Sequence, residues 1–144
     1  MSVISELLIG IRDLVELYET MLKQICEEYD LTLMEANIIS FLYHNPEYDT
    51  ASDIVRLRHF SKGAVSQAVE SLIQKSMIKR SPDDQDRRKI HLFLLPAADP
   101  ITNQMERIQQ IYQQQIFTGF STEEKQAFIA MHDRMMKNIH IKED

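Results

Sequence analysis

Hydrophobic positions recur every three or four residues along most of the chain, which is the period of an amphipathic helix. The first such stretch, residues 3–29, predicts one long helix with an apolar stripe formed by Ile4, Leu7, Ile11, Leu14, Tyr18, Met21 and Ile25. A helix of this size is roughly 40 Å long at about 1.5 Å per residue. A compact domain can hardly cover such a stripe by itself, so we expect a second copy of the chain to pack against it.

Capping patterns divide the middle of the chain into three shorter helices. Thr32 with Glu35, and Thr50 with Asp53, each form a capping box, and Ser61 is expected to cap the third helix. The last two helices are separated by about three residues. This arrangement is typical of a helix-turn-helix.

The helix that follows Ser61 has two distinct faces. Its apolar face contains Val65, Ala68, Val69, Leu72 and Ile73. Its opposite face carries small and polar residues, namely Lys62, Gly63, Ser66, Gln67 and Glu70. Residues 77–81 and 89–95 then predict a hairpin, because apolar and polar residues alternate in the second run. The hairpin would make the helix-turn-helix a winged one.

Two further amphipathic helices are expected after the hairpin. The pair Asp99-Pro100 is a cap followed by proline at the first helical position, and the stripe continues until Gly119. Ser121 and Glu124 form another capping box before the last helix.

These elements predict a mainly α fold of the α+β winged-helix type, with six helices and a two-stranded β-wing. We expect a single domain over residues 1–144, with residues 31–95 as the winged helix-turn-helix module. Residues 1–30 and 96–144 are expected to supply the dimerisation helices.

Charge is distributed unevenly along the chain, so the net charge of the whole chain does not describe each segment. The chain has a net charge of −6, yet residues 56–91 hold nine Lys or Arg and four acidic residues. A basic segment in an acidic chain indicates a one-sided surface for a polyanion such as DNA. An ordinary charged surface is the alternative.

Composition places the chain among cytoplasmic proteins. No apolar run reaches the roughly 20 residues that span a bilayer, so no membrane association is expected. The first residues lack a basic lead and a cleavage site, which argues against a signal peptide. A single cysteine, Cys26, excludes a disulfide framework within the chain.

The order and length of these elements resemble the MarR (multiple antibiotic resistance regulator) family. The local resemblances are Ser61–Ser66 to the start of its recognition helix, Lys75–Ile78 to the helix exit, Asp86-Arg87-Arg88 to the wing-tip signature and Phe120–Glu124 to the start of the last helix. Ser76 stands where that family usually has Gly. The resemblance implies a homodimeric transcriptional regulator, expected to be a repressor, that binds a palindromic operator in double-stranded DNA. It also implies release by a small-molecule effector or by oxidation.

The predicted DNA contacts lie on the polar helix face and at the hairpin tip. They are Ser61, Lys62, Gly63, Ser66, Gln67, Arg87, Arg88 and Lys89. Gln67 matches adenine in the major groove, and arginine at the tip suits a narrow minor groove. Asp86 is expected to orient one of the tip arginines; the alternative is that Asp86 and Arg88 only fasten the hairpin.

Other chemistries receive less support. No nucleophile elbow, phosphate loop or acid pair is present, so we expect neither an enzyme nor a cofactor. The five histidines lack the spacing of a metal site. Two alternatives to a DNA-binding regulator that a small molecule releases stay open. One is a winged-helix module that binds a protein, and the other is a redox-sensing repressor that acts through Cys26. A ligand pocket is conceivable near Tyr18, Met21, Phe41, Tyr43, Met105 and Tyr112, although core packing explains most of these residues.

Overall fold

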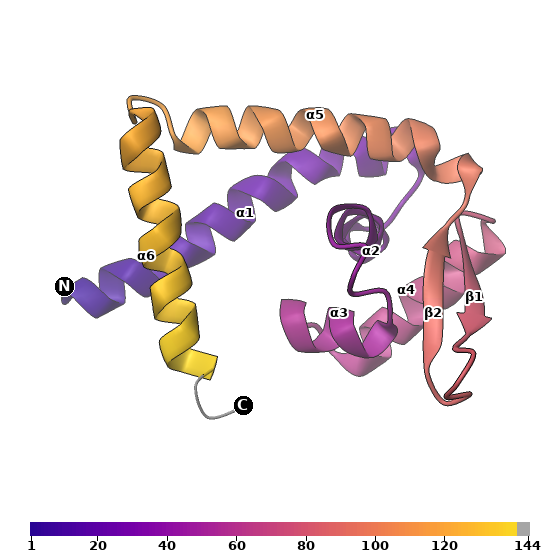
Figure 1. The fold of residues 1–144 in the computed structure, drawn as a ribbon. Coiled ribbons are helices and arrows are strands. Elements are labelled where there is room, and N and C mark those ends of the chain that lie inside the picture. Colours follow the sequence, from indigo (N-terminus) through magenta and orange to yellow (C-terminus); the bar gives the residue numbers. More distant parts are fainter. Residues whose placement is uncertain (141–144) are drawn as a thin grey trace. The chain divides into compact units, whose positions relative to one another are not determined.

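A computed structural model describes residues 1–140 (Figure 1). The elements are α1 (Val3–Tyr29), α2 (Leu33–His44), α3 (Ala51–Arg58), α4 (Lys62–Gln74), β1 (Ile78–Pro82), β2 (Ile90–Leu94), a 3-10 turn η1 (Pro96–Ala98), α5 (Asp99–Ile116) and α6 (Thr122–His140). They confirm the predicted six helices and two-stranded antiparallel wing. The chain forms two compact units, Met1–Ile108 and Gln109–Asp144.

Three of the helices in the first unit begin at the predicted caps. The hydroxyl of Thr32 accepts the amide of Glu35 at 3.1 Å, and the Glu35 carboxylate accepts the amide of Thr32 at 3.0 Å. Thr50 and Asp53 form the same reciprocal pair at the start of α3. Side-chain caps satisfy amides that a helix start would otherwise leave without an acceptor, which fixes where each helix begins.

The second helix of the chain, α2, is the centre of the first unit. It packs against α1, α4 and β2, and it is buried on nearly all sides from Glu35 to Leu42. The core contains the fully buried side chains of Ile38 and Ile39 from α2 itself, together with Leu22, Ile25, Ile54, Val65, Leu72, Ile78, Ile101 and Met105 from other elements. This core fixes α4 and the hairpin relative to one another.

Most of the apolar stripe of α1 remains uncovered in a single chain. Only Leu22 and Ile25 are fully buried, whereas Ile4 is 63% exposed and Leu8 is 59% exposed. We call the exposed part, formed by Val3, Ile4, Leu7, Leu8, Ile11, Leu14 and Val15, the α1 stripe. The prediction of a long helix with a surplus of apolar surface is therefore confirmed.

The hairpin pairs Ile78 with Leu94 at its base and Pro82 with Ile90 near its tip. Its strands differ by one residue at their ends from the predicted runs. Ser76, in the turn that leads from α4 into β1, has a φ of +59°. That left-handed conformation favours glycine, which accounts for the glycine usual there in the family that the sequence resembles.

The start of α5 differs from the sequence prediction. Asp99 does not cap the helix, because it already has helical dihedral angles and follows the 3-10 turn that begins after Leu95. The proline that fits a helix start is Pro96 rather than Pro100, and it opens the 3-10 turn. The helical run therefore begins at Pro96, with the 3-10 turn, instead of after Asp99.

The second unit contains the end of α5 and all of the described part of α6. Gly119 has a φ of +84° in the turn between them. Ser121 and Glu124 form the predicted capping box, with bonds of 3.1 and 2.8 Å. Phe117 makes edge-to-face contacts with Phe120 and Phe128, which close the turn.

None of the helices within residues 1–140 is both long enough and apolar enough to cross a membrane.

Candidate nucleic-acid interface

The fourth helix divides its residues between core and solvent as predicted. Val65, Ala68, Val69 and Leu72 are buried. All five residues of the opposite face, Lys62, Gly63, Ser66, Gln67 and Glu70, are exposed. The apolar face holds the helix on α2 and α3, so the polar face is presented to solvent by a rigid support.

The N-terminus of α4 has a side-chain cap, Ser61, and a glycine, Gly63, with open space around it. The Ser61 hydroxyl accepts the amide of Ala64 at 3.2 Å, while the earlier amides of the first turn have no partner inside the helix. A Cβ added at Gly63 would meet nothing within 4 Å. The fold itself does not need glycine there, so its small size matters only to a partner that approaches the helix.

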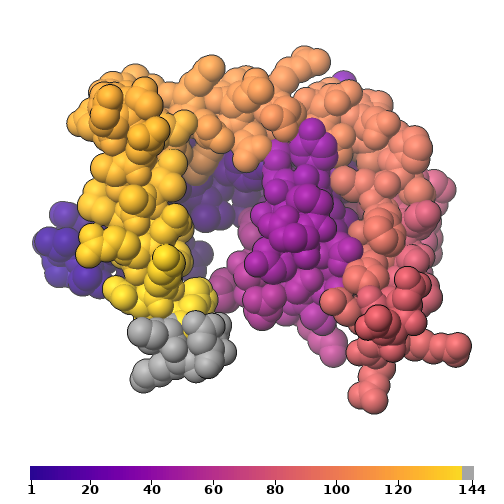
Figure 2. Space-filling view, in the orientation of Figure 1, coloured from indigo at the N-terminus to yellow at the C-terminus, as the bar shows by residue number. Residues whose placement is uncertain are grey.

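The tip of the wing is shaped by two carboxylates. Asp83 accepts the amides of Gln85 and Asp86, each at 3.0 Å, and Asp86 accepts the amide of Arg88 at 3.0 Å. The side chains of Arg87 and Arg88 are exposed, and in residues 1–140 neither guanidinium has an ion-pair partner. Figure 2 shows the hairpin tip projecting from the surface.

Asp86 does position one of the tip arginines, Arg88, but through the backbone of that residue and not through its side chain. Its carboxylate accepts the backbone N–H of Arg88 and forms no ion pair with an arginine side chain in the described part of the chain. The alternative in which Asp86 fastens the hairpin is correct for Asp86 alone, because the Arg88 side chain extends into solvent. The sequence signature thus contains one residue that shapes the loop and two arginines with exposed side chains.

An ion pair that no local pattern predicts links α4 to the wing. Arg80 of β1 donates to the carboxylate of Glu70, on the exposed face of α4. Glu70 was predicted to face the groove, and it does lie on that face, but its charge is balanced by Arg80. The pair removes one isolated negative charge from a surface that would face phosphates.

His91 of β2 lies between two carboxylates from different parts of the chain. Its Nδ1 is 2.7 Å from Oδ1 of Asp49, in the loop before α3, and its Nε2 is 2.8 Å from Oδ1 of Asp83. Hydrogen bonds to Asp49 and Asp83 raise the pKa of His91, and the bond to His91 helps lower the pKa of Asp83 to about 2. No spacing rule marks these three residues, which come together only through the fold of the wing.

A second charged contact fixes the other end of α4. Nζ of Lys75 lies 3.0 Å from Oε2 of Glu35 and donates to the carbonyl of Asp30 at 2.8 Å. Ser71 also donates to Glu35, at 3.1 Å. Burial by itself would raise the pKa of Glu35, but bonds from Thr32, Lys75 and Ser71 outweigh it and lower that pKa.

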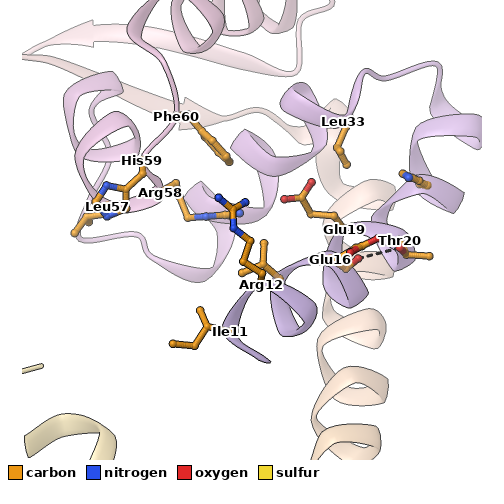
Figure 3. A pocket seen from close by; sticks show the side chains of 12 residues that line it. Ile11, Arg12, Glu16, Glu19, Thr20, Leu33, Leu57, Arg58, His59 and Phe60 are labelled. Atoms are coloured by element: carbon orange, nitrogen blue, oxygen red, sulfur yellow. Dashed lines mark hydrogen bonds between the residues drawn. The ribbon is translucent and has the colours of Figure 1, made fainter. Parts of the chain in front are cut away.

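A cleft of about 620 Å³ lies between α1 and the turn that joins α3 to α4 (Figure 3). Arg12, Glu19 and Phe60 point into it from opposite sides (Figure 3). Arg58 borders it, donates to Asn37 at 3.3 Å and lies 4.8 Å from the Phe60 ring centre. Burial lowers the pKa of Arg58 despite the nearby Glu19. The cleft mixes apolar and charged groups next to the helix-turn-helix.

The ligand pocket suggested by the sequence is only partly formed in the structure. Tyr18 and Phe41 line a smaller hollow of about 420 Å³, whereas Met105 is fully buried in the core. None of the residues that line the larger cleft was among those suggested by the sequence, because the cleft brings together α1 and the end of α3, which are distant in the chain.

Cys26 is half-buried, and its Sγ lies 3.7 Å from the carbonyl oxygen of Thr32. Burial raises the pKa of the thiol, and Glu35 and Glu27 raise it further. A raised thiol pKa lowers the thiolate fraction and hence reactivity. Within residues 1–140, no three His, Cys, Asp or Glu side chains are grouped so that they could hold a metal ion.

Comparison with known proteins identifies a family that the chain is similar to. Residues 29–89, which run from the end of α1 to the wing tip, match the model of the MarR family. The transcriptional regulator AdcR of Streptococcus pneumoniae is 30% identical over 87 residues, which cover 60% of this chain and 58% of that protein. The chain therefore aligns with little more than half of the length of this curated relative.

Solved structures share the fold over nearly the whole chain. A MarR-family transcriptional regulator from Silicibacter pomeroyi superposes with a TM-score of 0.75 at 20% identity, over 90% of this chain and 86% of that one. MepR of S. aureus in its complex with DNA gives a TM-score of 0.68 at 22% identity, over 90% and 93%. At these identities the likeness establishes the winged-helix fold.

Proposed function

We propose that the chain is a DNA-binding transcriptional repressor of the MarR family, because its winged helix-turn-helix module matches the model of that family, whose members are transcriptional regulators. One observation carries the proposal. A rigid core presents the exposed polar face of α4 beside a hairpin whose tip holds two exposed arginines, and neither has an ion-pair partner within residues 1–140. A helix of this kind suits a major groove, and a basic tip suits the adjoining minor groove.

Each predicted contact residue has a distinct role in this proposal. Gln67 pairs with adenine and supplies sequence choice, while Lys62 contacts guanine or a phosphate. Ser61 and the first amides of α4 hold a phosphate at the helix N-terminus. Arg88, with its neighbours Arg87 and Lys89, supplies affinity that depends little on sequence.

The proposed repressor acts as a homodimer on a palindromic operator. The α1 stripe supports this, since a monomeric protein rarely leaves so many large apolar side chains exposed on one helix. Two-fold symmetry would place the two α4 helices on half-sites separated by about one turn of DNA. Substitution of Leu7 and Leu8 by Glu should yield monomers in sedimentation equilibrium and weaken operator binding.

Release by a small-molecule effector completes the proposal. The cleft beside α1 supports it, because Arg58, His59 and Phe60 line the cleft and immediately precede Ser61, the cap of α4. A molecule bound there would contact the turn that sets the direction of the recognition helix. The mixed lining suits a compact molecule with both apolar and charged groups.

The proposal is tested by fluorescence anisotropy with a labelled duplex from the intergenic DNA upstream of the protein's own gene. We expect binding at low salt that weakens steeply as salt increases, with competition by that duplex stronger than by a scrambled one. Gln67→Ala should cost about 1–3 kcal/mol at one base pair and little elsewhere. No binding even at low salt would favour the rival function, a winged-helix module that docks a protein.

A further inference from the structure

His91 is held from both sides at the end of the wing nearest its tip. Both ring nitrogens lie within 2.8 Å of a carboxylate oxygen, from Asp49 on one side and Asp83 on the other. The backbone reinforces the first contact, because the amide of Leu92 donates to the carbonyl of Asp49 at 2.7 Å. We call Asp49, His91 and Asp83 the wing clasp.

The wing clasp is continuous with the tip that carries the exposed arginines. Asp83 binds His91 through Oδ1 and the amides of Gln85 and Asp86 through Oδ2. Asp86 in turn accepts the amide of Arg88. A chain of hydrogen bonds therefore runs from the loop before α3, through the imidazole, to the backbone of Arg88.

The geometry requires a particular protonation state. A neutral imidazole has one donor and one acceptor nitrogen, and an acceptor 2.7–2.8 Å from a carboxylate oxygen would be repelled. Only the imidazolium donates on both sides to ionised partners. The carboxylates lie on opposite sides of the ring, so they do not converge on a site for a metal ion.

We propose that the protonated His91 is a positioning residue for DNA binding: it clasps the wing to the loop before α3 and so orders the tip that carries Arg87 and Arg88. Loss of its proton releases the clasp and weakens DNA binding. The part that concerns DNA rests on the proposed function, whereas the clasp itself does not.

The charged groups around the ring determine how it titrates. Asp49 faces it from the loop before α3, and Asp83 from the wing loop. On α3, Asp53 is paired with Arg56. On β1, Lys79 lies 5.8 Å from the ring centre of Phe93 and forms no ion pair with His91 in the described residues.

On α2, burial lowers the pKa of His44, which reduces its positive charge near neutral pH. Among residues 1–140, the charged groups that act on the His91 ring are the carboxylates of Asp49 and Asp83.

The direction of the pH dependence follows from these contacts. The pKa of His91 is raised above its ordinary 6.5, so the clasp is complete below about pH 6.5 and is lost as pH rises through the raised value. The pKa of Asp83 is lowered to about 2, so its contribution is complete above its ordinary 3.8 and is lost as pH falls towards 2. The clasp is therefore complete between about pH 4 and 6.5.

The clasp is tested first without DNA, by NMR titration of the full-length protein. The Cε1–H signal of His91 should titrate above the ordinary range for histidine, and Asp49→Asn and Asp83→Asn should each lower its midpoint. The backbone amide signals of Gln85, Asp86 and Arg88 should shift with the same midpoint. Titration of His91 in the ordinary range, or tip amides that do not follow it, would overturn the proposal.

The consequence for DNA is tested by anisotropy at constant ionic strength from pH 6 to 9. His91→Gln can donate to only one carboxylate, and we expect it to bind DNA roughly tenfold more weakly at pH 6, with a shallower salt dependence. Wild-type affinity should fall towards that of the variant as pH rises, while the matched control His132→Gln on α6 should follow the wild type. Circular dichroism checks that His91→Gln is folded.

The outcomes separate the two proposals. If NMR shows the coupled titration but no duplex binds, the clasp stands and the assigned function fails. If DNA binds and His91→Gln has the wild-type affinity, salt dependence and pH profile, His91 does not position the wing for DNA.

Discussion

Glu35 and Lys75 form an ion pair of 3.0 Å in which the Glu35 side chain is only 3% exposed, whereas the Lys75 side chain is 34% exposed. The pair joins the capping box of α2 to the C-cap of α4. A carboxylate removed from water needs its partners, because an unpaired buried charge is unfavourable. This contact therefore fixes the end of the helix that we assign to DNA.

Lys75→Met should destabilise the protein by about 1–3 kcal/mol, less than for a fully buried pair because the lysine is partly solvated. Urea denaturation at pH 7 measures the change. Ser71→Ala, which removes a neutral donor to the same carboxylate, is the matched control and should cost about 1 kcal/mol. Equal stability of Lys75→Met and the wild type would show that water already solvates Glu35.

The same pair predicts a pH dependence of stability. Since the pKa of Glu35 is lowered, its contribution is present above its ordinary value of 4.5 and is lost as pH falls below it. Lys75→Met, which lacks one of the bonds that lower this pKa, should show a weaker loss of stability between pH 5 and 3 than the wild type.

Arg88→Ala should weaken DNA binding by a similar factor for every sequence and reduce the salt slope by about 1, because one phosphate contact is lost. Titration of binding against salt measures both quantities. Arg134→Ala on α6 provides a control for the loss of one positive charge outside the predicted contact set. An unchanged slope for Arg88→Ala would remove the wing tip from the interface.

Gly63→Ala should separate folding from binding. Alanine is the better helix former and has open space for its Cβ, so we expect stability to rise by about 0.5 kcal/mol. The added methyl group projects from the face assigned to the groove and should weaken DNA binding several-fold. Thermal denaturation and anisotropy on one preparation give both results, and unimpaired binding would show that DNA does not approach this position closely.

Arg80 and Glu70 should be coupled in DNA binding. Arg80→Ala leaves the Glu70 carboxylate unbalanced on the exposed face of α4 and should weaken binding. The same change in a Glu70→Gln background should cost less, giving a coupling of about 0.5–1 kcal/mol in a double-mutant cycle. Additive effects would mean that Arg80 acts as an independent contact with DNA.

Peroxide should leave DNA affinity unchanged, because the raised pKa of Cys26 keeps the thiol protonated and slow to react. Anisotropy before and after mild peroxide treatment measures this, with Cys26→Ser as the control. A loss of affinity in the wild type that a thiol reverses, and that Cys26→Ser lacks, would establish the redox-sensing alternative.

Local rules in the sequence account for most of the fold. The capping boxes at Thr32 and Thr50 and the cap at Ser61 depend on residues three positions apart, so short-range hydrogen bonding fixed those helix starts. The period of the apolar residues likewise predicted which face of α4 is buried and which face is exposed. The start of α5 was misjudged because the turn at Pro96 depends on how the chain leaves β2.

Tertiary structure alone decided the charged contacts. Asp49 and His91 are 42 residues apart, and Glu35 and Lys75 are 40 apart, so no local pattern predicts either pair. The cleft at Arg58 likewise exists only because the fold brings α1 near the end of α3. The sequence by itself determined which elements form and which residues face solvent, since both follow from neighbours along the chain. Which charged side chains pair with one another depends on long-range packing. This packing places His91 between two carboxylates, where we propose that it positions the wing.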